Sequence, residues 1–447
     1  MVAVHPSRGG GERWEVGLKK SHRGPLKSAN FRWLALSSTT SSLGDAFGGF
    51  ALLFLVLEAG GNAALAGAVV AMVELPGVLL ALLGGVWADR FDRMRLMILS
   101  DIGRAVCQAV LFILFWTDAA TWWHVALFGF LTNTLGCVYA PSVSGVIPQT
   151  VADRHLTGAN GLLYTGRTAA VAIGTAAGGT VIALFGARTA IALNALSFVL
   201  SALFLSAIRL PSSALRVHDA GAAQGVWQDL RAGWSEVRKR SWLLSELLRS
   251  AIEMPIVVAP FAIIGPLMAV DTLGGAGSWA TISIGFLCGS LCGPFVVRFW
   301  KPRRPIWACT ALMYLGAVPP LLLALTTSVP LITLAEGVKG AAVGFFGTIW
   351  ASLLQREISD AVRSRVNAWD YTLTSGLMPF GYLLAGLMVN QFGRQPILLL
   401  GVVWNILAVT MVLALPGVRR FRVDWNGPAS AEPPASALGD KTEEVTR

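Results

Sequence analysis

The positively charged residues of this chain alternate between the gaps that separate twelve long apolar stretches. Of the 35 Lys and Arg residues, all but six lie in the two tails or in every second gap. Only Arg188 and Arg394 fall in the remaining gaps, and the other four lie inside stretches. Loops on the cytoplasmic side of a membrane collect Lys and Arg, so this bias sets the orientation of a chain that crosses a membrane repeatedly. The pattern predicts a multi-pass membrane protein with both termini in the cytoplasm.

The apolar stretches have the length of membrane-spanning helices, which need about 20 residues each. Hydrophobic residues make up 54% of the chain and charged residues only 13%, which is about half of the charged share of a soluble protein. The sequence therefore predicts an all-α membrane protein with twelve transmembrane helices. We expect these helices to begin near Arg32, Ala64, Leu96, Thr121, Gly158, Thr189, Leu243, Trp279, Ile306, Val329, Asn367 and Gln395.

The two halves of the chain resemble each other. When the sequence is shifted by 207 residues, Asn160 and Tyr164 fall on Asn367 and Tyr371, with several glycines matching around them. Two pseudo-symmetric six-helix bundles explain this repeat. One large class of secondary transporters is built from parallel repeats of this kind, with the substrate site at the interface between them.

The positions of the spans divide the chain into five segments. We expect a cytoplasmic basic tail over 1–28, an N-terminal bundle over 29–208, a cytoplasmic linker over 209–241, a C-terminal bundle over 242–416 and a cytoplasmic disordered tail over 417–447. Residues 226–240 of the linker have the pattern of an amphipathic basic helix, which we expect to lie on the membrane or on a neighbouring loop. From Asp424 on, the Pro, Ala, Ser and Glu content predicts disorder.

The segment that follows the second span carries a family signature. Residues 84–95 read Gly-Gly-Val-Trp-Ala-Asp-Arg-Phe-Asp-Arg-Met-Arg, which resembles the pattern G-x-x-x-D-R-x-G-R-R between helices 2 and 3 of the major facilitator superfamily. The Asp where the last Gly usually stands is similar to the macrolide-efflux and enterobactin-exporter-like branch of proton-driven drug exporters. Residues 42–45 and 100–104 extend the resemblance. It implies the major facilitator fold, over residues 29 to 416, in a bacterial plasma (inner) membrane.

The resemblance also implies a role for this loop. In the family, the cluster is a conformational latch that stabilises the outward-facing state. We carry this role to Gly85, Asp89, Arg90, Arg93 and Asp101. The plain alternative is that the basic residues only anchor the loop at the cytoplasmic face. In the second-half copy of the loop Val297 stands where the acid should be, so any latch is expected to be asymmetric.

A glycine pattern in the fifth span has two interpretations. Gly174, Gly178 and Gly179 match part of the antiporter pattern G-x-x-x-G-P-x-x-G-G, but Thr175 stands in the place of the proline. Small residues at a spacing of four also let helices approach closely, and we interpret the three glycines as a helix-packing motif. The direction of transport therefore does not follow from this motif alone.

Four acidic residues inside the spans are candidates for proton or substrate coupling. Ionisable residues inside a membrane cost about 2.5–3.5 kcal/mol each on insertion scales, so they are functional candidates by default. Removal of a carboxyl group from water raises its pKa toward neutrality, which proton exchange needs. The candidates are Asp45, Glu74, Glu253 and Glu336. Asp45 is the most isolated of them, whereas Glu253 follows Arg249 by four residues and Glu336 precedes Lys339 by three, spacings that also permit local ion pairs.

The sequence contains no arrangement of residues that indicates catalysis. It has no phosphate-binding loop, no nucleophile elbow and no His or Cys spacing typical of a metal site. The net charge of +10 follows from the cytoplasmic loops, since no motif that reads nucleic acid accompanies it. We therefore expect neither an enzyme nor a protein that uses a cofactor, a metal or nucleic acid.

These observations favour a secondary active transporter that works by alternating access. The most specific hypothesis is a proton-coupled exporter of an amphiphilic small molecule, such as an antibiotic or a siderophore. Its partners would be that substrate, protons and the lipid bilayer, and we expect a monomer. The alternatives are an importer or metabolite carrier of the same fold, and a membrane scaffold or sensor that does not transport.

Overall fold

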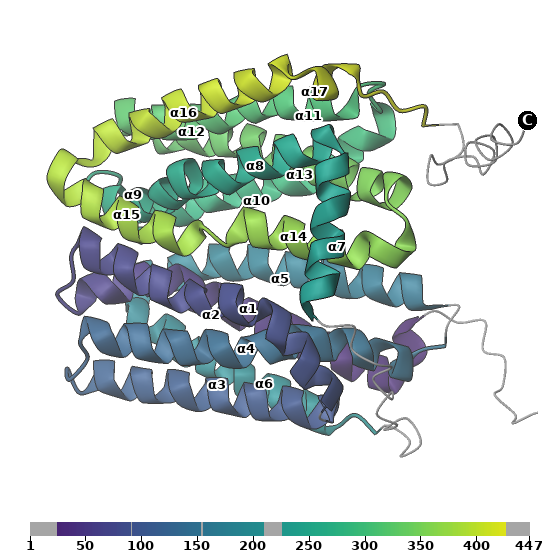
Figure 1. Cartoon of the computed structure of the whole chain (residues 1–447). Coiled ribbons are helices and arrows are strands. Elements are labelled where there is room, and N and C mark those ends of the chain that lie inside the picture. Colours follow the sequence, from purple (N-terminus) through teal and green to yellow (C-terminus); the bar gives the residue numbers. More distant parts are fainter. Residues whose placement is uncertain (1–24, 91, 153–154, 210–225, 426–447) are drawn as a thin grey trace, which may run out of the picture.

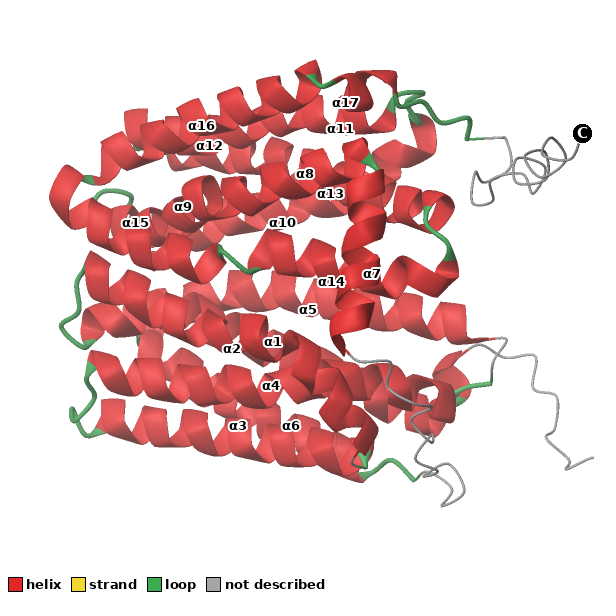
Figure 2. Ribbon diagram, in the orientation of Figure 1, coloured by secondary structure: helices red, strands yellow, loops and turns green. Residues whose placement is uncertain are grey.

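The computed structural model describes residues 25–90, 92–152, 155–209 and 226–425 (Figure 1). Most of the predicted N-terminal tail, part of the linker and most of the predicted C-terminal tail lie outside the described residues. Within them the chain is almost entirely helical (Figure 2), and twelve helices are long and apolar enough to cross a membrane. This confirms the expected all-α fold, and each span begins within a few residues of its predicted start.

The N-terminal half consists of six long helices. They are α1 (Ala29–Glu58), α2 (Ala63–Arg90), α3 (Arg93–Trp116), α4 (Trp122–Thr150), α5 (Leu156–Phe185) and α6 (Ala187–Ser206), preceded by the short 3-10 helix η1 (Pro25–Lys27). Ser28 caps α1 by accepting a hydrogen bond from the backbone N–H of Phe31. Gly186 turns the chain between α5 and α6 with a φ of 82°, and Gly393 does the same in the second half with a φ of 81°. Glycine is favoured at both positions because other residues rarely adopt a positive φ.

The C-terminal half contains shorter helices because three of its spans are broken. The elements are α7 (Val226–Lys239), α8 (Ser241–Glu253), η4 (Met254–Val258), α9 (Ala259–Asp271), α10 (Ala276–Phe299), α11 (Pro305–Leu312), η5 (Met313–Ala317), α12 (Val318–Leu325), α13 (Val329–Glu357), α14 (Asp360–Ser375), α15 (Met378–Phe392), α16 (Arg394–Ala414) and α17 (Pro416–Arg420). Pro255, Pro319 and Pro379 lie at the breaks. Proline removes a backbone donor and clashes with the preceding turn, which bends or ends a helix.

The two halves touch at the end of the bundle that carries the turns after α1, α5, α9 and α15, on the left in Figure 1. Gly67 on α2 lies against the backbone of Gly386 on α15, and Gly179 on α5 lies against Ala280 on α10. Apolar side chains from α1, α2 and the C-terminal half fill the space around these glycines. We call this set of glycine and apolar contacts the inter-half contact. The charge pattern predicts that this end faces outward.

The amphipathic helix of the linker packs against the C-terminal half. Helix α7 lies on α14, where the rings of Trp234 and Trp369 are 4.9 Å apart. Val237 is fully buried in the same apolar cluster, and a Cβ at Gly233 would collide with the backbone of Arg365. The predicted amphipathic helix therefore packs against another helix of the protein, α14.

The last described residues also pack against the C-terminal half. Helix α17 follows α16 directly, and Val418 and Val423 are buried. The backbone N–H of Val423 donates to the carbonyl of Arg303 at 3.0 Å, and the indole of Trp425 donates to the carbonyl of Pro302 at 2.9 Å. The packed part of the chain thus extends to residue 425, beyond the predicted boundary at 416.

Candidate functional site

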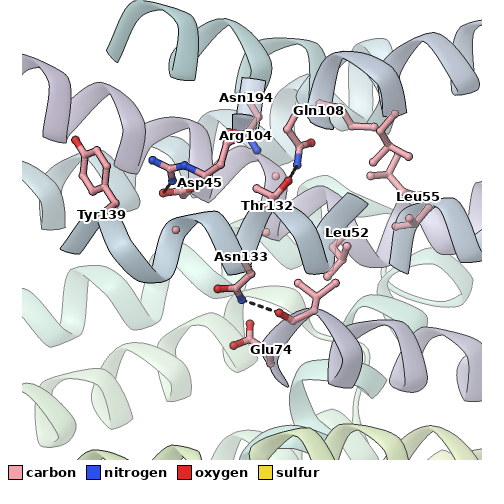
Figure 3. Close-up of a pocket in the computed structure, with 18 of the residues that line it drawn as sticks. Asp45, Leu52, Leu55, Glu74, Arg104, Gln108, Thr132, Asn133, Tyr139 and Asn194 are labelled. Atoms are coloured by element: carbon pink, nitrogen blue, oxygen red, sulfur yellow. Dashed lines mark hydrogen bonds and ion pairs between the residues drawn. The ribbon is translucent and has the colours of Figure 1, made fainter. Parts of the chain in front are cut away.

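A cavity of about 370 Å³ lies inside the N-terminal half, and all six of its helices contribute to the wall. This is within the range of small-molecule sites. Figure 3 shows the wall, in which Leu52 and Leu55 lie apart from a group of polar side chains. A cavity with both kinds of wall suits a molecule that is itself part apolar and part polar.

The charged part of the wall is built around Arg104 on α3. One nitrogen of its guanidinium, Nη1, lies 3.5 Å from the carboxylate of Asp45 on α1, and Nη2 pairs with Asp101 one turn earlier on α3. The side chains of Arg104 and Asp101 are 4% and 0% exposed. The Asp45 side chain is 50% exposed, and that exposed part faces the cavity. Asp45 is therefore the member of this cluster that a solute in the cavity can reach.

Further contacts hold Arg104 in place. Its guanidinium carbon lies 4.1 Å from the ring centre of Phe198 and 5.0 Å from that of Tyr139. Cations are attracted to the faces of such rings. Ser201 donates to the second carboxylate oxygen of Asp101 at 2.6 Å. A buried charge is tolerated when it is paired and hydrogen-bonded. Asp101 and the Nη2 of Arg104 meet both conditions, whereas the Nε of Arg104 has no hydrogen-bond partner among the described residues.

Glycines on α1 explain how the neighbouring wall is formed. A Cβ at Gly44 would collide with Ser197 on α6, and a Cβ at Gly48 would collide with Asn194. Gly44 directly precedes Asp45 and Gly48 follows it by three residues, so the glycines let α6 approach α1 beside Asp45. Asn194 lines the cavity, and its amide oxygen has no hydrogen-bond partner among the described residues.

Several polar residues of the cavity wall were not predicted as site residues from the sequence. Gln108 donates to Thr132 at 3.0 Å, and Asn133 donates to the carbonyl of Val73 at 2.7 Å. Arg167 on α5 reaches toward α1, with its Nε 3.4 Å from the hydroxyl of Ser42. One available signal was the series Asp101, Arg104 and Gln108, whose spacing places three polar side chains on one face of an otherwise apolar helix.

Glu74 lies on the same cavity but is separate from the cluster around Arg104 (Figure 3). It has neither a hydrogen bond nor an ion pair with any described residue. A Cβ at Gly77, one turn further along the same face of α2, would lie 3.8 Å from the hydroxyl of Tyr371 in the C-terminal half. Glu74 therefore faces the region between the halves.

The structure places Glu253 in a different cluster, inside the C-terminal half. Arg249 lies between Glu246 and Glu253 on α8 and pairs with both, with its Nε 2.8 Å from Glu246. Thr310 donates to Glu246, and Asn405 donates to Glu253 at 3.1 Å. Glu246, Arg249 and Glu253 are 1%, 7% and 8% exposed. The local ion pair that the sequence spacing permits is formed here.

Glu336 is also paired locally. Its carboxylate lies 2.9 Å from the ammonium group of Lys339 on α13. The same ammonium lies 5.0 Å from the ring centre of Phe261 and 5.4 Å from that of Phe286. Of the four candidate acids, Asp45 and Glu74 line the cavity, whereas Glu253 and Glu336 lie in ion pairs elsewhere.

Only two of the five predicted latch residues have described side chains, and these two lie apart from each other. The side chains of residues 81–90 lie outside the described residues, and these include Gly85, Asp89 and Arg90. Arg93 is the first residue of α3, and its guanidinium lies against Gly145 of α4. Asp101 lies two turns further along α3, where it pairs with Arg104 in the cavity wall.

The three glycines of α5 all lie at close helix contacts. A Cβ at Gly174 or Gly178 would meet α1, and one at Gly179 would meet Ala280 of α10 in the other half. The motif thus lies against one helix of its own half and one helix of the second half.

Comparison with known proteins identifies the family. The Major Facilitator Superfamily profile matches residues 34–382. Macrolide efflux protein A of Streptococcus pyogenes is 23% identical over 376 residues, which cover 82% of this chain and 89% of the relative. Multidrug efflux pump Tap of Mycobacterium tuberculosis is 26% identical over 417 residues, which cover 90% and 96%.

Solved structures show the same fold. A bacterial homologue of the iron transporter ferroportin, in an inward-facing state, aligns with a TM-score of 0.67 at 16% identity, over 88% of this chain and 99% of that one. The nucleoside transporter NupG aligns with a TM-score of 0.66 at 14% identity, over 88% and 100%. The profile match, the twelve spans and the fold lead to one conclusion. The chain belongs to the major facilitator superfamily and is a membrane transporter.

Proposed function

We propose that this protein is a proton-coupled exporter of an amphiphilic small molecule, such as an antibiotic or a siderophore. The two efflux relatives, at 23% and 26% identity over most of their length, support export. The observation that carries the proposal is Asp45, a carboxylate that is half exposed to a cavity inside the N-terminal half.

The charges around the cavity explain how a proton and a substrate would compete. Asp45 and Asp101 balance Arg104 and Arg167, which all lie in or beside the wall. If Asp45 takes up a proton, the group gains one net positive charge, while Arg104 keeps Asp101 as its partner. The protonated site then disfavours a cationic substrate and the ionised site favours it, because charges interact strongly over short distances away from water. Such competition is what antiport requires.

The inter-half contact supports alternating access. It closes the end of the bundle that the charge pattern predicts to face outward. A state that is closed there would receive substrate from the cytoplasm, as an exporter needs. Release of substrate would require the halves to separate at Gly67 and Gly386 and to close at the opposite end.

Substitution of Asp45 tests the coupling. Asp45→Asn mimics the protonated carboxyl at nearly constant volume. In vesicles that contain the purified protein, the variant should exchange erythromycin or ethidium down a gradient. It should lose essentially all accumulation driven by a pH gradient, and Asp45→Glu should keep part of it with a shifted pH optimum.

The matched control uses the equivalent acid of the second half. Asp45 falls on Glu253 when the sequence is shifted by 208 residues. Glu253→Gln, in the molecules that fold, should keep accumulation driven by a pH gradient. If Asp45→Asn accumulates substrate at the normal rate, Asp45 is structural, and Glu74 becomes the next acid to test.

We also propose the latch role for Gly85, Asp89, Arg90 and Arg93. A latch biases an equilibrium between two packed states without touching the substrate. Asp89→Asn should therefore abolish turnover while substrate binding, measured as stabilisation of purified protein by erythromycin, stays unchanged. Full transport by Asp89→Asn would reduce the loop to an anchor on the cytoplasmic face.

A further inference from the structure

The loop between α10 and α11 repeats the basic residues of the latch loop without its acid. When the sequence is shifted by 208 residues, Arg93 falls on Lys301 and Asp89 falls on Val297. Val297 is buried in the apolar core of the C-terminal half. The second loop therefore lacks the carboxylate that the first loop carries beside its arginines.

A second cavity, of about 350 Å³, lies at this loop. Its wall consists of Arg304 from the loop, Arg419 and Arg420 from α17, and Ala414 and Pro416 at the end of α16. The three arginines are exposed, and none of them forms an ion pair with a described residue. Three positive charges around one hollow repel one another unless an anion lies between them.

The three arginines are held together by the fold. The segment after α17 is tied to the loop by the hydrogen bond from Val423 to the carbonyl of Arg303, at 3.0 Å. A second bond runs from the Trp425 indole to the carbonyl of Pro302, at 2.9 Å. Arg304 and the α17 arginines therefore approach one another because their backbones are fixed.

The cavity lies at the boundary between membrane and water. One span begins immediately after Arg304, and another ends just before Pro416. Trp300 and Trp307, on either side of the loop, are 46% and 41% exposed. Tryptophan is enriched at the depth of the lipid headgroups. An anion in this cavity would therefore lie at the depth of the lipid phosphates.

We propose that Arg304, Arg419 and Arg420 bind the phosphate of an anionic phospholipid such as phosphatidylglycerol. Guanidinium groups form paired, charge-assisted hydrogen bonds with phosphate oxygens. Leu415, which lies between the lining residues Ala414 and Pro416 and is 43% exposed, offers an apolar surface to the acyl chains. Phe299, at the end of α10, is 85% exposed. A free phosphate ion would make no use of that surface. The bound lipid would join the α10–α11 loop to the end of α16, and this role is independent of the transported substrate.

Titration of the purified full-length protein with short-chain lipids tests the proposal. In a neutral detergent, dioctanoyl-phosphatidylglycerol should raise the midpoint of thermal unfolding, because a ligand that binds only the folded state stabilises it. Dioctanoyl-phosphatidylcholine should not. The triple variant R304Q/R419Q/R420Q should bind phosphatidylglycerol about a hundredfold more weakly, because each basic residue near an anionic lipid adds roughly a factor of five.

Arg231→Gln is the matched control. Arg231 is an exposed arginine on α7, outside the cavity, and its loss should leave the affinity for phosphatidylglycerol unchanged. If the triple variant does not fold, R304Q and R420Q alone should each weaken binding about fivefold. The proposal is overturned if the arginine variants bind phosphatidylglycerol as the wild type does. It is also overturned if phosphatidylcholine or inorganic phosphate stabilises the protein equally.

Discussion

Each half of the protein buries a charged cluster around one arginine, and the N-terminal cluster lies in the wall of the cavity of about 370 Å³. Arg104 lies between Asp101 and Asp45, and the Asp45 side chain is 50% exposed. In the second half Arg249 lies between Glu246 and Glu253, and the Glu253 side chain is only 11% exposed. A shift of 208 residues relates Asp45 to Glu253 but places Arg104 on Leu312. The two clusters are therefore similar in chemistry without being copies of each other, and the packing around each decides which acid a solute can reach.

The bend in the α8–α9 span explains why the second cluster is shielded from solvent. In the most apolar part of this span 67% of the residues are buried inside the protein, against 39% in the corresponding part of α1. The turn η4 brings Pro255 against Gly381 of α15 and Ile256 against Gly401 of α16. Small residues on both neighbours let the bent span lie inside the bundle. Asn405 then donates to Glu253, whereas Asn194 on α6 lines the cavity beside Asp45.

The largest effect is expected from removal of the central arginine. Arg249→Gln leaves Glu246 and Glu253 buried without a cation, and loss of one member of a buried ion pair costs about 3–5 kcal/mol. Arg104→Gln should cost less, because Asp45 faces the cavity. Thermal unfolding of the two purified variants measures the difference. An equal loss of stability in both variants would mean that the two clusters are equally shielded from solvent.

An intermediate effect is expected where the two halves meet. A Cβ at Gly386 would collide with the backbone of Ala63, whereas a Cβ at Gly347 would meet nothing within 4 Å. Both glycines lie in helices, so alanine should add up to about 1 kcal/mol of helix stability at each. Gly386→Ala should nevertheless loosen the inter-half contact, while Gly347→Ala should not. A cysteine at Val70, buried in that contact, should then react faster with an impermeant thiol reagent in intact cells.

The labelling experiment needs a background without the five native cysteines. A cysteine at Asn62, in the exposed turn after α1, should react from outside in either variant. Absence of that reaction would contradict the assigned orientation. Equal labelling at Val70 in both variants would show that Gly386 is not part of the barrier between the halves.

The sequence predicted the spans because they depend on long-range averages of hydropathy and charge, and it predicted the repeat because polar residues and glycines recur at a shift of 207 residues. It could not predict the cavity wall, because Asp45 and Arg104 meet only when α1 and α3 pack together. The breaks in three spans of the second half were missed because Pro and Gly are tolerated in membrane helices whose neighbours satisfy the backbone. The packed segment up to Trp425 was missed because its composition, rich in charge, differs little from that of a solvated tail.

The smallest effect is expected in a third cluster, which lies outside the spans. Glu236 on α7 accepts hydrogen bonds from Lys239 and Arg240, and Arg240 also donates to the carbonyl of Glu357 at the end of α13. The hydrogen bond from Lys239, followed by that from Arg240, lowers the pKa of Glu236 below its ordinary value of 4.5. A lowered pKa means that this contribution to stability is present above pH 4.5 and is lost as the pH falls through the pKa of the folded protein.

Substitution of Glu236 should therefore loosen α7 slightly and only at neutral pH. Partly exposed ion pairs contribute about 0.2–1 kcal/mol, so Glu236→Gln should raise hydrogen exchange in α7 about two- to fivefold at pH 7. After correction for the intrinsic exchange rate, the difference from the wild type should vanish near pH 4. Arg231→Gln on the same helix should change little at either pH. A difference that persists or grows in acid would show that Glu236 holds α7 through packing, and the contrast between buried and exposed clusters would then not extend to the linker.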